Sequence, residues 1–211
     1  MASALIHMCV AKEINKKLQM NEKELMIGSI APDLGKLLGQ TKDKGHFLEF
    51  DRYTSNLPLF LQKYDTSKPF EMGYYIHLFT DILWFRDFLP KYTTKNLIRL
   101  NDGKVLELCF KDRLEMIYRD YSSLNNFINS YYGLNLDFLK EPYVEIKSNI
   151  TEIETNKINL LLKETNTIIN ASEEKELLVF KKEKIIEFIN YSAKIILEEV
   201  ENGKLNTCKQ I

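Results

Sequence analysis

Apolar and polar positions along this chain recur with the spacing of an α-helix more than with the alternation of a β-strand. Near the start, His7, Ala11, Ile14 and Leu18 follow one another at intervals of four, three and four residues. This spacing puts them on one helical face. Ser3 is suited to cap the helix, because its hydroxyl oxygen can accept a hydrogen bond from the first turn. His7 is therefore expected to point toward the core.

The strongest helical pattern covers residues 70–88, where large aromatic residues share one face with two polar ones. The stripe consists of Phe70, Tyr74, His77, Asp81, Trp84 and Phe88. A shorter helix is predicted over residues 24–30, ending before Pro32, because proline restricts the preceding residue and lacks an N–H. Further helices are predicted over residues 102–120, 122–131, 151–169 and 173–200.

These elements predict an all-α protein, a single-domain helical bundle over residues 1–200 followed by a tail at residues 201–211. A length of 211 residues fits one domain, and 45% hydrophobic residues suffice for a sizeable core. No stretch approaches the roughly 18 apolar residues that a membrane span needs. The beginning of the sequence shows no secretion signal, so a cytoplasmic location is expected.

Charge and cysteine content exclude some functions. The formal net charge of −1 argues against broad nucleic-acid binding through general positive charge. Three cysteines, an odd number without a Cys-x-x-Cys pair, fit a reducing compartment and exclude a cysteine-rich zinc module. The oligomeric state stays open.

The three histidines of the chain stand where metal ligands are expected. His7 is on an apolar helix face, and His46 ends the polar loop of residues 39–46. His77 precedes Asp81 by four residues, one helical turn, so that both side chains can reach one ion. Asp33 adds a carboxylate after an apolar run.

Burial of an ionised Asp81 within an aromatic stripe is costly unless a cation or strong donors compensate. A divalent metal ion resolves this conflict. Imidazole nitrogens combined with carboxylate oxygens suit zinc first and iron or manganese next, whereas calcium and magnesium prefer oxygen ligands alone. We therefore expect one or two divalent ions.

Each candidate ligand also has an ordinary explanation when it is taken singly. A histidine on an apolar face can be a hydrogen-bonded core residue, and Asp33 can be a turn residue. Asp120 is a further candidate metal ligand, with the alternative that it caps the next helix. Asp87 can supply an oxygen ligand or simply face solvent. The combination of His7, Asp33, His46, His77 and Asp81 favours a metal site.

Over roughly its first 90 residues the chain resembles the zinc-dependent phospholipases C and the related single-strand-specific nucleases, which are all-α proteins with metals between helices. The order His7, Asp33, His46, His77-x-x-x-Asp81 carries the resemblance. It implies that Asp33, His46, His77 and Asp81 hold one ion, while His7 and a bridging Asp81 hold another. Family phospholipases add later histidines, a glutamate and an N-terminal amine as ligands, but no histidine follows His77 here.

The function predicted from the sequence is metal-dependent hydrolysis of a small-molecule or lipid phosphoester by a metal-activated water, with Asp33 as general base. Four basic residues near the ligands either meet substrate phosphate or face solvent: Lys36, Lys42, Lys44 and Arg86. The alternative is a helical binding or regulatory module with a structural metal and no turnover. A third reading is a helical interaction protein without metal.

Overall fold

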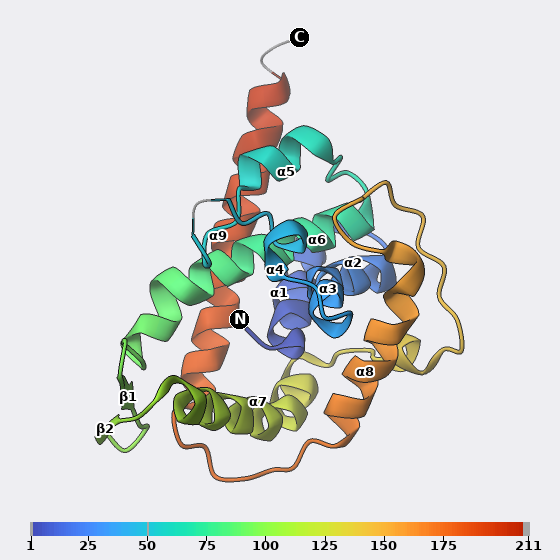
Figure 1. The fold of residues 1–211 in the computed structure, drawn as a ribbon. Coiled ribbons are helices and arrows are strands. Elements are labelled where there is room, and N and C mark those ends of the chain that lie inside the picture. Colours follow the sequence, from blue (N-terminus) through green and yellow to red (C-terminus); the bar gives the residue numbers. More distant parts are fainter. Residues whose placement is uncertain (1, 50, 209–211) are drawn as a thin grey trace.

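Three helices form the centre of the molecule: α1 (Ala4–Leu18), α2 (Glu22–Gly28) and α6 (Pro69–Leu83), which contact one another. The computed structural model describes residues 2–49 and 51–208 (Figure 1). The Ser3 hydroxyl accepts from the Ile6 N–H at 3.4 Å and caps α1, as the sequence predicts. Most of α6 is buried, which explains why its sequence is aromatic on more than one face.

The other elements surround this centre. The helices are α3 (Leu34–Leu37), α4 (Lys42–Gly45), α5 (Leu57–Lys63), α7 (Phe110–Tyr132), α8 (Ile158–Asn170) and α9 (Lys182–Cys208). Short 3-10 turns are η1 (Ala31–Asp33), η3 (Leu89–Lys91), η4 (Asp137–Lys140) and η5 (Thr155–Lys157), and η2 (Trp84–Phe88) is a π-helical turn that continues α6. Strands β1 (Leu97–Arg99) and β2 (Val105–Glu107) form a small antiparallel hairpin in which Ile98 faces Leu106. The prediction of an all-α fold is confirmed.

Two glycines allow α2 and α6 to cross at backbone contact. A Cβ atom added at Gly28 would overlap the Phe70 carbonyl group, and one added at Gly73 would overlap the Leu25 carbonyl oxygen. His77 lies one helical turn after Gly73, so this close crossing also brings α6 up to the backbone that follows α2. The crossing therefore helps to position the candidate site.

Substitution of Gly73 by alanine is expected to destabilise the protein by about 1–3 kcal/mol, because two packed backbones would have to separate. Gly203→Ala is the matched control, since Gly203 also lies in a helix and an added Cβ there meets nothing within 4 Å. Chemical denaturation of both variants tests the prediction. Equal stability of the two variants would show that the crossing tolerates a side chain.

The helix predicted over residues 102–120 is wrong in its first part. Residues 97–107 form the β-hairpin instead, and its turn carries Gly103 at a φ of +92°. The Asp102 carboxylate accepts from the Lys104 N–H at 2.9 Å, a side-chain turn that competes with helix formation. Helix α7 starts only at Phe110 and continues through residues 121–132, so the predicted break near residue 121 is also wrong.

The predicted helix over residues 173–200 begins later and ends later in the structure. Residues 173–181 form a connection without regular secondary structure, and α9 runs from Lys182 to Cys208, past the predicted end at residue 200. The last residues of the predicted tail, 209–211, lie outside the described residues. Within the described part of the chain, none of the helices is long and apolar enough to cross a membrane.

Candidate metal centre

The structure brings together five of the six residues predicted to bind metal. His7 comes from α1, Asp33 from the end of η1, and His46 from the residue after α4. His77 and Asp81 lie one turn apart in α6. Two overlapping groups result, namely Asp33 with His46 and His77, and His7 with His77 and Asp81. In each group one ligand atom per residue lies within 4.8 Å of the others.

The first group has the spacing of ligands around one ion. The His46 and His77 Nε2 atoms lie 3.2 Å apart, and His46 Nε2 lies 3.6 Å from Asp33 Oδ1. Asp81 Oδ2 lies 3.8 Å from His77 Nε2 and 3.9 Å from His46 Nε2. Ligands that sit about 2.0–2.1 Å from a tetrahedral zinc ion are roughly 3.4 Å from one another. Asp33, His46 and His77 therefore have the spacing of ligands around one tetrahedral ion, and Asp81 lies beside the two histidines.

The second group shares His77 with the first and adds Asp81, whose Oδ2 also lies near His46. His7 Nε2 lies 3.4 Å from Asp81 Oδ1, whereas the other oxygen, Oδ2, is the one that faces His46 and His77. The His7 and His77 rings stack with centroids 3.9 Å apart. The backbone N–H of Ala2 also donates to Asp81 Oδ1 at 3.2 Å. Asp81 thus stands between two sets of donors, as a bridging ligand would.

A backbone contact fixes the tautomer of His77. Its Nδ1 lies 2.8 Å from the Ser29 carbonyl oxygen, which can only accept, so Nδ1 must carry the proton. In the neutral ring the Nε2 lone pair is then free and faces His46 and Asp81. This arrangement is how proteins orient a metal-binding histidine. Ser29 lies next to Gly28, so the close helix crossing brings this carbonyl to His77.

Buried polar atoms in the cluster have no hydrogen-bond partner among the described residues. They are both ring nitrogens of His7, Nδ1 of His46 and Oδ1 of Asp33. His7, His46, His77 and Asp81 are buried, and the side chain of Asp33 is 17% exposed. An unpaired buried polar group costs about 1–3 kcal/mol, so several of them together point to a missing partner. The nitrogen and oxygen donors fit a divalent ion such as zinc.

The ionisation states also suit metal binding. Burial, reinforced by His7, lowers the pKa of His77 to about 3, so its ring is neutral near pH 7. Burial alone would raise the pKa of Asp33 and Asp81, but the adjacent histidine rings outweigh it and hold both pKa values below the ordinary range. Neutral imidazole and ionised carboxylate are the forms that bind a metal ion.

Asp120, the sixth predicted ligand, is not brought to the cluster. It lies in the middle of α7, where its buried carboxylate accepts hydrogen bonds from three successive backbone N–H groups. The donors are Leu178, Val179 and Phe180, at 2.8–2.9 Å. Both oxygens are thereby engaged, and Asp120 fastens the connection before α9 onto α7. It belongs to neither group of metal-binding side chains.

Asp87 and the four basic residues predicted to lie near the ligands do not gather in one place. Asp87 lies in η2, accepts two hydrogen bonds from Arg86 at 2.7 Å, and accepts another from the Tyr191 hydroxyl at 3.0 Å. Lys44 is exposed on α4. Lys36 lines a pocket together with Asp33. Lys42 is half-buried on α4, where burial lowers its pKa and the Asp33 carboxylate opposes that shift.

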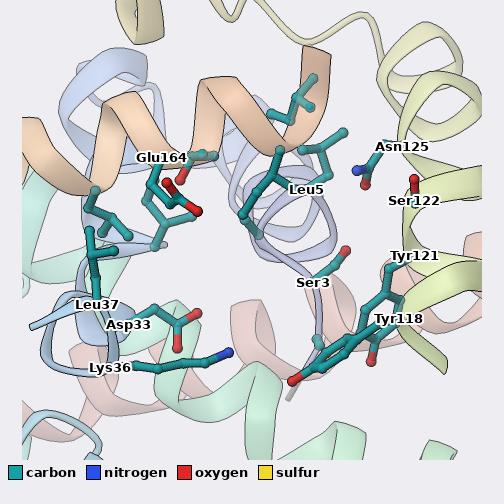
Figure 2. A pocket seen from close by; sticks show the side chains of 17 residues that line it. Ser3, Leu5, Asp33, Lys36, Leu37, Tyr118, Tyr121, Ser122, Asn125 and Glu164 are labelled. Atoms are coloured by element: carbon teal, nitrogen blue, oxygen red, sulfur yellow. The ribbon is translucent and has the colours of Figure 1, made fainter. Parts of the chain in front are cut away.

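The pocket has a volume of about 520 Å³. Figure 2 shows the side chains that line it, among them Asp33. Asp33 is the member of the two groups that lines it. Its walls come from the start of α1, from α3, and from α7 and α8, far away in the sequence. Sequence reasoning missed Ser29 and the pocket residues of α7 and α8, because nothing in their local sequence links them to His46 or His77.

The fold and the site define an all-α protein with a buried His/Asp centre suited to a divalent metal ion. The family model described as zinc dependent phospholipase C matches residues 2–175. The chain therefore belongs to the zinc-dependent phospholipase C family, as the resemblance seen in the sequence implies. Comparison with curated proteins and with solved structures gives no match.

Proposed function

We propose that this protein is a metal-dependent hydrolase of phosphoesters. The observation that carries the proposal is the position of Asp33, which belongs to a metal-binding group and also lines a pocket of ligand size. A purely structural metal site is closed by protein ligands, whereas a catalytic one opens toward substrate. The membership of the zinc-dependent phospholipase C family supports the same function.

The residues of the centre have distinct tasks in this proposal. Asp33, His46 and His77, with Asp81 beside them, would hold one ion, and His7 with Asp81 would contribute to a second. A zinc ion bound there supplies Lewis-acid chemistry, which acidifies water and neutralises charge that develops on phosphoryl oxygens. Asp33 faces the pocket and accepts the proton of the attacking water.

The experiment combines metal analysis with an assay. The purified protein is analysed for zinc, iron and manganese, and hydrolysis of bis-p-nitrophenyl phosphate and p-nitrophenyl phosphate is measured before and after chelation. We expect bound zinc, activity that chelator abolishes, and recovery on adding zinc. Zinc bound without turnover of either ester would overturn the proposal and favour the structural-metal module. Absence of bound metal would contradict both.

A further inference from the structure

His46 differs from His77 in how its side chain is held. The Nδ1 atom of His77 lies against the Ser29 carbonyl oxygen, whereas Nδ1 of His46 is buried without a hydrogen-bond partner among the described residues. His46 is the residue that follows α4, a helix of only four residues. The position of its ring therefore depends on the backbone turn that carries it.

Tyr74 holds this turn from α6. Its hydroxyl group donates a hydrogen bond to the Gly45 carbonyl oxygen, the backbone group directly before His46. Tyr74 lies three residues before His77, so one helix carries both a metal-binding histidine and the donor that contacts the neighbouring turn. This hydrogen bond ties the backbone of His46 to the helix that carries His77 and Asp81.

The ring of Tyr74 is itself held by aromatic contacts. It is fully buried and stacks on Phe60 of α5, with ring centroids 5.4 Å apart. Phe47, the residue after His46, packs edge-on against both rings. Because aromatic pairs prefer such stacked and edge-to-face arrangements, they restrict the orientation of the phenol. The hydroxyl group therefore stays directed at the turn.

The surroundings of Gly45 leave little room for the turn to move. A Cβ atom added there would lie 3.1 Å from the Pro32 carbonyl oxygen and 3.3 Å from Ile153 Cγ2, closer than ordinary contact. Pro32 directly precedes Asp33, another candidate ligand. The turn that carries His46 is therefore packed against the segment of Asp33 as well as against α6.

The residue after His46 has an unusual backbone conformation. Phe47 has a φ of +54°, in the left-handed region that residues other than glycine rarely adopt. Its carbonyl oxygen accepts from the Asn56 N–H at 2.8 Å, and its ring lies against Tyr74. Such a conformation persists only where the surroundings hold it, and it is frequent at ligand sites. The backbone is thus held on both sides of His46.

We propose that Tyr74 is a positioning residue of the metal centre: its hydrogen bond to the backbone sets the distance between His46 and His77 and thereby the affinity for zinc. The inference rests on the metal site of the proposed function and not on turnover. The 3.2 Å between the two Nε2 atoms is the spacing that the hydrogen bond maintains. Without it the turn shifts, and zinc binding must then restore the ligand geometry.

Tyr74→Phe tests the proposal, because it removes the hydroxyl group and keeps the buried ring. The zinc dissociation constant of the full-length protein is measured by competition with a chromogenic chelator. We expect it to rise about 10-fold to 100-fold, the usual effect of losing a group that orients a metal ligand. Tyr75→Phe is the matched control and should leave the constant unchanged, since Tyr75 is also a buried tyrosine of α6 but packs against Phe79.

Two further measurements separate positioning from folding. A purely structural hydroxyl group would lower the urea midpoint of the metal-free protein and leave the zinc affinity of the folded state unchanged. In the cobalt(II)-substituted protein the visible absorption bands depend on the arrangement of the ligands, so Tyr74→Phe should shift them and Tyr75→Phe should not. A wild-type zinc dissociation constant and an unshifted cobalt spectrum in Tyr74→Phe would overturn the proposal.

A second variant perturbs the same turn while it keeps the Tyr74 hydroxyl group. In Gly45→Ala the added Cβ atom presses on the Pro32 carbonyl oxygen, so the zinc dissociation constant should rise as well. Gly35→Ala is its control, because an added Cβ atom there meets nothing closer than 3.5 Å. An unchanged constant in Gly45→Ala would count against the proposal, since the metal site would then tolerate a shift of the turn.

The failure of this inference can be told apart from the failure of the proposed function. Zinc bound by the wild type without hydrolysis of either phosphoester would overturn the hydrolase, while weaker zinc binding by Tyr74→Phe would still support the positioning role. Zinc-dependent hydrolysis combined with equal zinc affinity in the wild type and Tyr74→Phe would support the function and overturn the inference.

Discussion

Replacement of Asp81 by asparagine is expected to abolish the stabilisation of the protein by zinc. Asp81 belongs to the group of His7 and His77 and also lies near His46, with Oδ2 toward His46 and His77 and Oδ1 toward His7, so loss of its charge is expected to weaken metal binding by both groups. A ligand present at about 100 times its dissociation constant stabilises a protein by about 2.7 kcal/mol. For a chain of this size, that corresponds to a rise of about 5–10 °C in Tm, which the variant should lack.

The measurement is thermal unfolding with and without zinc, together with the zinc content after dialysis. Asp87→Asn is the matched control, because Asp87 is an aspartate that pairs with Arg86 outside the cluster. His77→Ala, which removes a ligand common to both groups, should behave like Asp81→Asn. A normal zinc-induced rise in Tm in both variants would place the metal elsewhere in the protein.

The local sequence predicts those helices whose stability depends on their own pattern. The start of α1 follows from Ser3 and a regular apolar face, and the burial of α6 follows from its aromatic stripe. The hairpin depends on a turn within residues 97–107, and the late start of α9 depends on a contact between distant parts of the chain. Asp102 forms a turn that stops helix formation, and Asp120 binds backbone groups nearly 60 residues away. Such a tertiary contact leaves no periodic signal in the sequence.

The candidate ligands could be predicted because their chemistry is unusual for their surroundings. A histidine or an aspartate within an apolar stripe, such as His77 or Asp81, is costly to bury and so signals a partner. The pocket could not be predicted in the same way. Residues such as Tyr118 and Leu161 are common on helices that face a core, and only the packing of α8 against both α3 and α7 brings them beside Asp33.

Replacement of Asp33 by asparagine is expected to lower catalysis while zinc stays bound. Asp33→Asn keeps an oxygen that can remain near the ion but removes the ability to accept a proton. At saturating zinc, kcat is expected to fall by about 10²–10⁴, the usual contribution of a general base. The decrease should affect kcat and kcat/KM equally, because the proton moves only in the transition state.

Asp43→Asn is the matched control for this variant, since Asp43 is an exposed aspartate on the neighbouring helix α4 and is not part of the cluster. Zinc content is measured alongside the rate, so that loss of the ion is not mistaken for loss of the base. A zinc-loaded Asp33→Asn protein with a kcat within twofold of the wild type would exclude Asp33 as the base. The pocket that Asp33 lines would then serve only to admit the substrate.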